Sequence, residues 1–259
     1  MRCIFCKQDS STSKTIEHII PESLGNKEHT LPAGVVCDDC NNYFSHQVEA
    51  PLLNSDYFRD VRSRMWVPSK KGRIPTIQAL ALPSMVVVEL MNDEWGKSIC
   101  PKNEKDSYKL INSLRTHNSG SLIVPIPVFP DEKTVSRFLG KVAIEVLAFR
   151  FLKIESGLDE VIDKPELDQL RKFTRYGTPE VQWPYYKRRI YPEDKKYYEE
   201  GYGSFEILHE FNLLYTETNE LYLILAIFGI EYGINYGGPE IDGYIDWLKK
   251  NDYKSYLYK

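Results

Sequence analysis

The sequence predicts an α+β protein, in which a small ββα unit stapled by four cysteines precedes an α+β accessory domain with an antiparallel sheet. Three observations support this fold class. Two Cys-x-x-Cys pairs, Cys3/Cys6 and Cys37/Cys40, enclose a short segment that contains β-formers. Apolar residues at helical spacing cover residues 134–152, and alternating β-formers fill residues 204–237. We expect a boundary near residue 55, which gives domains at 1–55 and 56–259.

The composition is that of a folded protein outside the membrane. With 259 residues, of which 42% are hydrophobic, the chain can bury a substantial core. The net charge of -4 does not by itself indicate a nucleic-acid-binding protein. The longest apolar run, at 221–230, has about half the length that a membrane helix needs. We therefore expect a cytoplasmic protein, in which reduced cysteines bind metal more often than they form disulfides.

The four paired cysteines are expected to hold one structural zinc ion. Two Cys-x-x-Cys knuckles can bring four thiolates to a tetrahedral ion at about 2.3 Å. A redox dithiol is the alternative, but such a pair is expected beside a strand-helix unit rather than in two copies. Because a ββα unit of this size is too small to be stable through hydrophobic burial alone, its folding should depend on the zinc.

The segment between the cysteine pairs predicts the elements of this unit in order. The isoleucines of "IEHII" (16–20) indicate a short strand that carries Glu17 and His18 and ends near Pro21. "SLGNKEHTLPAG" (23–34) is expected to be a loop, and the two valines before Cys37 a second strand. A helix should begin near residue 40, with Pro51 ending its first regular stretch.

These residue types suit the hydrolysis of a phosphodiester, which needs a base, a divalent cation and oxygen ligands for that cation. His18 has an imidazole, whose ordinary pKa lies near neutrality. Asn41 or Asn42 offers an amide oxygen suited to Mg²⁺ or Mn²⁺. Adjacent residues of a strand point to opposite faces, so Glu17 and His18 need a bend or a nearby helix to serve one centre.

The motifs "CIFC", "EHIIP", "LG" and "CDDCNN" together resemble the zinc-knuckle branch of the HNH endonucleases, the ββα-metal nucleases, over the first 55 residues or so. The resemblance implies a nuclease that leaves 5′-phosphate and 3′-hydroxyl ends. It makes His18 the general base, and Glu17 and Asn41 the ligands of one catalytic Mg²⁺ or Mn²⁺. This sequence departs from the family in having Glu17 where Asp is more frequent, and Asn26 is the nearest counterpart of the family's middle asparagine.

An alternative ligand set follows from helix geometry. If Asn42 were the helix ligand, His46 would lie one turn further on the same face and could also reach the cation. Asn41 and His46 are instead separated by about 140°. We favour Asn41, because it directly follows the last cysteine, and keep Asn42 with His46 as the alternative.

A basic connecting segment at 59–73 is expected to bind DNA phosphates. Six basic residues oppose one acid there, which gives a local charge of +5: Arg59, Arg62, Arg64, Lys70, Lys71 and Arg73 against Asp60. Trp66 lies within the segment and could stack on a base, but we favour packing into the core for a lone tryptophan. A second, weaker contact is expected from residues 187–189, on a long structured loop at 172–196.

The C-terminal part has the opposite charge. Residues 197–248 contain ten acidic residues and no Lys or Arg, and alternating β-formers predict an antiparallel sheet with a hairpin turn at 216–220. This acidic part should repel DNA, and it could bind a basic protein partner or mediate self-association.

Together these features favour a metal-dependent endonuclease that acts on DNA, with RNA as a less favoured substrate. A role in bacterial restriction or antiphage defence is suggested by analogy alone. The alternative is a non-catalytic zinc module that binds nucleic acid or protein. The acid-histidine pair at Glu17 and His18 distinguishes the two, since a binding module has no need of it.

Overall fold

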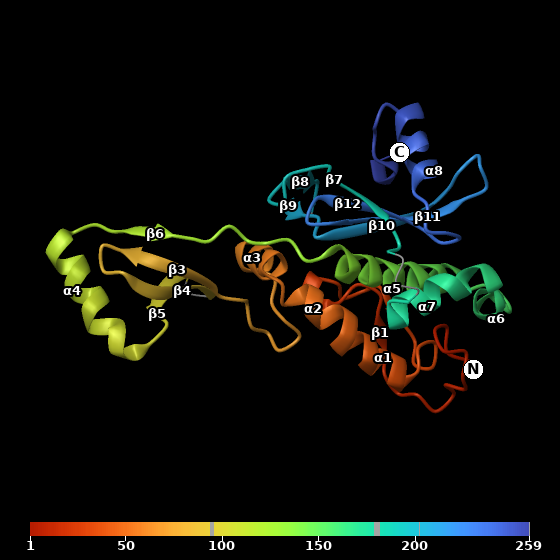
Figure 1. Cartoon of the computed structure of the whole chain (residues 1–259), viewed down its shortest axis with the longest axis horizontal. Coiled ribbons are helices and arrows are strands. Elements are labelled where there is room, and N and C mark those ends of the chain that lie inside the picture. The colour runs from red at the N-terminus through yellow and green to blue at the C-terminus, as the bar shows by residue number, and fades with distance from the viewer. Residues whose placement is uncertain (94–95, 179–181, 202, 259) are drawn as a thin grey trace. The chain divides into compact units, whose positions relative to one another are not determined.

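The computed structural model describes residues 1–93, 96–178, 182–201 and 203–258, and its mixture of helices and antiparallel sheets confirms the α+β class (Figure 1). The chain forms two compact units. Unit 1 consists of Met1–Leu52 with Pro130–Lys259, and unit 2 is Leu53–Phe129. The first break lies close to the expected boundary at residue 55. The chain returns to unit 1 at Pro130, which the division expected from the sequence did not include.

Two short strands begin unit 1. Strand β1 (Glu17–His18) pairs antiparallel with β2 (Thr30–Leu31), and the loop between them contains the 3-10 turn η1 (Glu22–Leu24). The second strand expected at the two valines before Cys37 was wrong, because Val36 makes only an isolated bridge to Ala33. The loop after β1 ends at Thr30, which pairs with His18. The strand that pairs with β1 is therefore formed by Thr30 and Leu31, before the two valines in the sequence.

One continuous helical stretch follows the second cysteine pair. It runs through α1 (Asp38–Phe44), a π-helical turn η2 (Ser45–Glu49) and α2 (Ala50–Leu53). The expectation that Pro51 ends the first regular stretch was therefore wrong. Proline lacks an N–H and its ring clashes with the carbonyl four residues back in a regular α-helix. Here the preceding turn is wide, since the Ala50 N–H bonds to the Ser45 carbonyl five residues back, so the helical path continues past Pro51.

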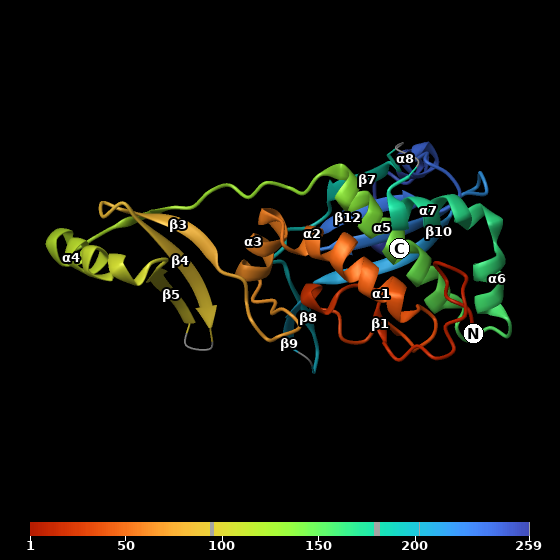
Figure 2. The same cartoon turned by 60° about the horizontal axis from the view of Figure 1, so that its bottom comes forward.

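Helix α5 (Glu132–Phe151) is the centre of unit 1 and confirms the helix predicted at 134–152. Most of its residues are buried, including both apolar and charged side chains, so the helix must be covered on more than one side. Helices α6 (Gly157–Asp163) and α7 (Asp168–Tyr176) pack along it, and strand β12 of the C-terminal sheet packs against it as well (Figure 2).

The C-terminal sheet of unit 1 has the strand order β10-β11-β12-β7, with every neighbouring pair antiparallel. Its strands are β10 (His209–Tyr215), β11 (Leu221–Ile227), β12 (Ile230–Asn235) and β7 (Tyr185–Arg189). The antiparallel sheet and the turn at 216–220 are confirmed, the turn being closed by Thr216 N–H to Glu220 O at 2.9 Å. Helix α8 (Asp242–Lys250) covers this sheet, with Tyr244 packed on Tyr222.

The loop expected at 172–196 was wrong where α7 and β7 lie. Tyr185 and its neighbours pair with β12, so a tyrosine-rich segment joins the sheet edge instead of crossing the surface as a loop. Residues 179–181 of that segment lie outside the described part of the chain. A small hairpin follows, formed by β8 (Lys196–Glu199) and β9 (Gly203–Glu206), and the 3-10 turn η5 (Tyr256–Tyr258) lies near the C-terminus.

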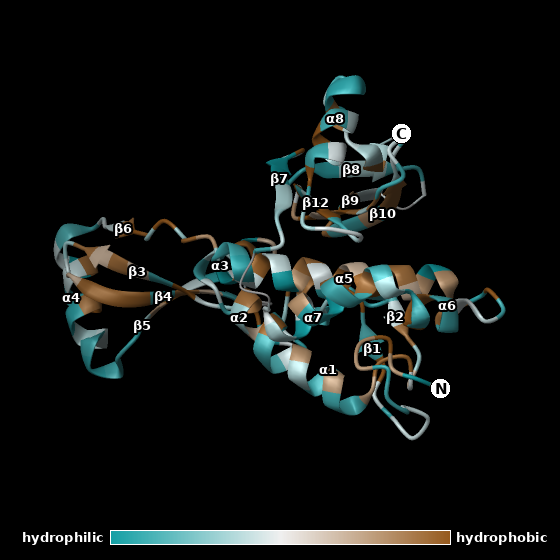
Figure 3. Cartoon of the chain, turned by 45° about the vertical axis from the view of Figure 1, so that its right-hand side comes forward, coloured by the Kyte–Doolittle hydropathy of each residue, from teal (hydrophilic) through white to brown (hydrophobic). Residues whose placement is uncertain are grey.

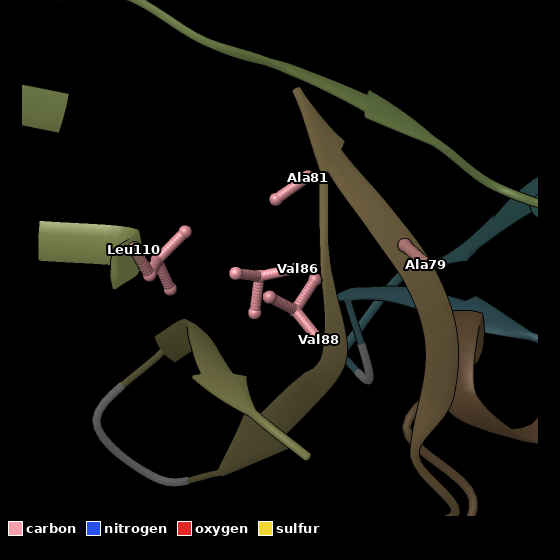
Figure 4. Close-up of a cluster of buried hydrophobic side chains, with 5 residues drawn as sticks. All are labelled: Ala79, Ala81, Val86, Val88 and Leu110. Carbon is pink, nitrogen blue, oxygen red and sulfur yellow. The ribbon is translucent and has the colours of Figure 1, made fainter. Parts of the chain in front are cut away.

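Unit 2 has its own sheet, in the order β5-β4-β3-β6, and its own core. Its elements are α3 (Asp56–Arg64), β3 (Ile77–Leu82), β4 (Val86–Asp93), β5 (Gly96–Pro101), η3 (Glu104–Asp106), α4 (Ser107–His117) and β6 (Ser121–Ile123). Small and branched side chains of β3 and β4 meet Leu110 of α4 in one cluster (Figure 4). Figure 3 shows the apolar character of β4 as a brown ribbon.

The two β-like runs expected in this region had different outcomes. The run at 84–91 is confirmed as β4, whereas the run at 121–129 forms a strand only over Ser121–Ile123. Pro125 and Pro127 explain the early end, since a proline cannot donate to a ladder. Among the described helices of either unit, none combines the length and apolar character needed to cross a membrane.

Candidate metal centre and HNH site

The four paired cysteines lie together, as the sequence predicts. Their sulfur atoms are all within 4.8 Å of one another, and the Cys6 and Cys37 sulfurs are 3.7 Å apart. Cys3 lies on a tight turn closed by Lys7 N–H to Cys3 O, and Cys37 caps the N-terminus of α1. Backbone N–H groups of Cys37 and Cys40 point at sulfur atoms at 3.4 Å, which favours thiolates there. The set fits a closed tetrahedral zinc site.

An arginine from a distant helix lies beside this cluster. Arg175, on α7, has its Nη1 atom 2.6 Å from the sulfur of Cys40, and its guanidinium lies 4.9 Å from the ring centroid of Tyr43. Four thiolates and one Zn²⁺ carry a net charge of about -2, which a neighbouring cation offsets. The sequence did not single out Arg175, because this contact depends on how α7 packs against the knuckle.

Strand β1 presents Glu17 and His18 to opposite sides, as a regular strand requires. Glu17 is only 5% exposed, whereas His18 is half-buried and reaches the surface. The pairing of His18 with Thr30 fixes its backbone against β2. Of the two residues that the resemblance makes catalytic on this strand, only the histidine is accessible.

Asn26 ties together the loop that joins the two strands. Its side chain is 1% exposed and makes four hydrogen bonds. The Nδ2 atom donates to the carbonyls of Ile20 at 2.7 Å and His29 at 2.9 Å, and Oδ1 accepts from the N–H groups of Glu28 and His29. The residue nearest to the family's middle asparagine therefore holds the end of β1 close to the start of β2.

A second clasp joins the chain before β1 to helix α1. The carboxylate of Asp38 accepts hydrogen bonds from the backbone N–H groups of Lys14 and Thr15 and from the Thr15 hydroxyl at 2.6 Å. These bonds lower the pKa of Asp38, with the Thr15 hydroxyl as the largest cause. The clasp and the cysteine cluster together fix α1 relative to β1.

The helix candidates for a catalytic cation all lie toward the surface. Asn41 is half-buried on α1, and Asn42 and His46 are exposed. His46 belongs to the π-helical turn, so the four-residue spacing of a regular α-helix does not apply between it and Asn42. The assignment of Asn41 as the ligand, with Asn42 and His46 as the alternative, stays a prediction.

The carboxylate of Glu17 lies in a buried cluster with a lysine from α5. Lys141 is fully buried, and its Nζ atom is 2.6 Å from Glu17, 2.7 Å from Glu49 and 2.9 Å from Glu145. Burial alone would lower the pKa of Lys141, but these carboxylates raise it well above its ordinary range, so the ammonium stays charged. Burial raises the pKa of Glu17, and Lys141 opposes that rise.

The expected cation ligands therefore do not fit as a set. Asn41 is accessible, but Glu17 is enclosed and engaged by Lys141. Within the described ranges, the four cysteines are the only group of three or more His, Cys, Asp or Glu side chains close enough to hold an ion. The sequence carries a signal for the lysine cluster, since Lys141 and Glu145 are charged residues four apart in the otherwise apolar stretch 138–149.

The basic connecting segment lies in unit 2 and is less uniform than its charge suggests. Arg62 is 4% exposed, so it does not present its guanidinium to a phosphate, and the DNA contact expected of it is not supported. Arg64 pairs with Asp60 at 2.7 Å, and Arg59 donates to the Thr76 carbonyl. Three basic residues of the segment are exposed on one turn at 69–73: Lys70, Lys71 and Arg73.

Trp66 precedes that turn and is 42% exposed, so the core position considered for it was wrong. The second expected contact, at 187–189, lies on β7 of unit 1. Arg188 there pairs with the buried Glu231 at 2.7 Å, so its guanidinium links β7 to the neighbouring strand β12. The acidic part is also partly internal, since Glu231 accepts from Tyr244 as well.

The comparison with known families bears on the N-terminal segment. Residues 3–56 match the family model described as HNH endonuclease. The resemblance read from the cysteine pairs and "EHIIP" is therefore confirmed over this segment, which we call the HNH segment. No curated protein and no solved structure matches the chain significantly. A match to this family over the HNH segment suggests a nuclease that binds nucleic acid.

Proposed function

We propose that the HNH segment is the catalytic unit of a DNA endonuclease, with His18 as its general base. The observation that carries this proposal is the placement of His18. It is a half-buried histidine that reaches the surface, on a strand held by the Asn26 loop, the Asp38 clasp and four clustered cysteines. A rigid, accessible imidazole next to solvent is what proton abstraction from water requires.

In the proposed reaction, His18 takes a proton from the attacking water, and the hydroxide forms a bond to the phosphorus of a phosphodiester. The bond from phosphorus to the 3′ oxygen breaks, and that oxygen leaves with its electron pair and takes a proton from solvent to become the 3′-hydroxyl. A bound Mg²⁺ or Mn²⁺ would neutralise the negative charge that develops on the scissile phosphate. Asn41 is the expected ligand whose side chain is accessible for that ion. The zinc held by the cysteines has a different task, since a closed four-thiolate site has no free position for substrate.

The exposed turn of unit 2 supports nucleic acid as the substrate. Lys70, Lys71 and Arg73 present three positive charges close in sequence, and Trp66 offers an exposed ring. The three positive charges attract phosphates, and bases can stack on the Trp66 ring. DNA is favoured over RNA by the family resemblance. A role in restriction or antiphage defence, and a partner for the acidic residues 197–248, stay predictions.

The test is cleavage of supercoiled plasmid by zinc-loaded protein, with and without Mg²⁺ or Mn²⁺. Single-stranded RNA is tested as a substrate in parallel under the same conditions. His18→Ala should reduce the cleavage rate by about 100-fold or more, because the base is lost, while DNA binding and unfolding temperature stay unchanged. His117→Ala is the matched control, since His117 is an exposed histidine of unit 2. Equal rates for wild type and His18→Ala would contradict the assignment of the base.

One observation favours a second candidate, a non-catalytic zinc module that binds nucleic acid. The carboxylate that the resemblance assigns to the cation is enclosed with Lys141. In that case the protein would bind DNA with a salt dependence set by its exposed basic turn, and it would cut neither plasmid nor RNA under any metal condition.

A further inference from the structure

We propose that the Lys141 ammonium is the resident cation of a buried carboxylate centre, and that Glu17 is its ion-pair partner rather than a ligand of a catalytic metal. The centre joins three elements of unit 1: β1 through Glu17, η2 through Glu49, and α5 through Lys141 and Glu145. This inference holds whether or not the HNH segment cleaves DNA.

The geometry around Nζ is complete. An ammonium has three N–H donors, and three carboxylates lie at 2.6, 2.7 and 2.9 Å from this nitrogen. The His18 carbonyl lies further away, at 3.4 Å. A buried lysine without partners would lose its proton, whereas one with three carboxylates in contact keeps its charge. Lys141 is therefore bound as a metal ion would be, by oxygen atoms from separate elements.

The surroundings of Glu17 are unsuited to a hydrated cation. Its side chain is 7% exposed and that of Lys141 is fully buried, so little water reaches the carboxylate. Mg²⁺ gives up its water reluctantly and usually keeps several water ligands in protein sites. An ion at Glu17 would also lie close to the positive charge of Lys141, which repels it. Both effects favour the lysine as the counter-ion.

The charges of the centre also explain why Glu145 differs from the other two acids. Three carboxylates face one ammonium, and the Oε1 atom of Glu145 has no hydrogen-bond partner among the described residues. Glu145 is fully buried, and burial raises its pKa well above the ordinary range. A proton on Glu145 would leave Glu17 and Glu49 as the two charged partners of Lys141.

The centre also holds the strand that carries His18, the proposed general base. The lysine holds the Glu17 side chain on the inner face of β1, and the next residue is His18, whose ring is directed to the other face. Glu49 attaches the same lysine to the helix that carries Asn41. Lys141 thus holds the base strand and the ligand helix at a fixed separation without touching either functional side chain.

The first experiment asks whether Glu17 binds a divalent cation. Thermal unfolding of zinc-loaded wild type, Glu17→Gln and the exposed control Glu155→Gln is recorded with and without millimolar Mn²⁺. We expect Mn²⁺ to change the unfolding temperature of all three proteins equally, or of none. A Mn²⁺ stabilisation that is present in wild type and control but lost in Glu17→Gln would overturn the proposal.

The second experiment tests the ion pair itself. Lys141→Met should lower the unfolding temperature by about 10 °C, because it leaves buried carboxylates without a counter-ion. Adding Glu17→Gln to Lys141→Met should recover part of that loss, because one of those charges is removed. Additive losses in the double variant would show that the two residues do not interact. If Lys141→Met does not fold, recovery of a folded double variant gives the same answer, and failure of both leaves the Mn²⁺ comparison to decide.

Discussion

Removal of one knuckle cysteine tests the role of zinc most directly. Cys40→Ser changes one atom of a fully buried residue whose sulfur belongs to the cluster of four. Structural zinc in small domains contributes apparent binding free energies of about 10–16 kcal/mol, and a whole domain is stable by only about 5–15 kcal/mol. With only three thiolates, the site should lose most of this binding free energy. The HNH segment should therefore be unfolded in Cys40→Ser.

The assay combines zinc content per chain with limited proteolysis. Wild type should contain one zinc per chain and resist cleavage within residues 1–52, and Cys40→Ser should lose the metal and be cut there. Cys100→Ser is the matched control, because Cys100 is a free and exposed thiol of unit 2. Unit 2 has its own apolar cluster around Leu110, so its protection should persist in the variant. Well-folded Cys40→Ser protein without zinc would refute the reasoning.

Three further predictions concern other parts of the chain. Asn26→Ala should destabilise unit 1 by about 3 kcal/mol in urea unfolding, because four hydrogen-bond partners lose their bonds, and Asn26→Asp should not restore the loss, because a carboxylate cannot donate to the Ile20 and His29 carbonyls. Burial, together with the charge of His29, lowers the pKa of His209 to about 4, below its unfolded value near 6.5. The unfolded state therefore binds the proton first, and about 2–3 kcal/mol of stability should be lost as the pH falls from 6.5 to 4. His209→Gln should remove that part of the pH dependence, and an identical profile would contradict it. Replacing Lys70 and Lys71 with Gln should reduce the salt dependence of DNA binding by roughly two units of slope, and an unchanged slope would exclude this turn from the interface.

The features that could be predicted from the sequence are those set by neighbouring residues. The spacing of Cys3, Cys6, Cys37 and Cys40 predicts their cluster, because a Cys-x-x-Cys turn directs both sulfurs to one side. The apolar spacing at 134–152 predicts α5, and alternation at 204–237 predicts the strands of the C-terminal sheet. Each of these patterns depends on local geometry with a fixed period.

The features that could not be predicted depend on partners far away in the sequence. Nothing near Glu17 indicates that its carboxylate meets Lys141, and nothing near Arg62 shows that its helix buries it. Pro51 was expected to end a regular helix stretch, but the wide turn before it depends on hydrogen bonds that a sequence pattern does not show. The sequence predicts a loop at Tyr185, because its pairing strand lies more than 40 residues later. The charge of a segment likewise does not reveal which of its side chains reach the surface.

The interruption of unit 1 by residues 53–129 imposes an order on its formation during synthesis. The four cysteines are complete by residue 40, so zinc can bind while the second half of the chain is still being made. Lys141 follows His18 by 123 residues, which a ribosome needs roughly ten seconds to add. Until then Glu17 and Glu49 have no ammonium between them and stay hydrated. A nascent chain released early would carry its metal without its internal counter-ion, and its base strand would lack its attachment to α5.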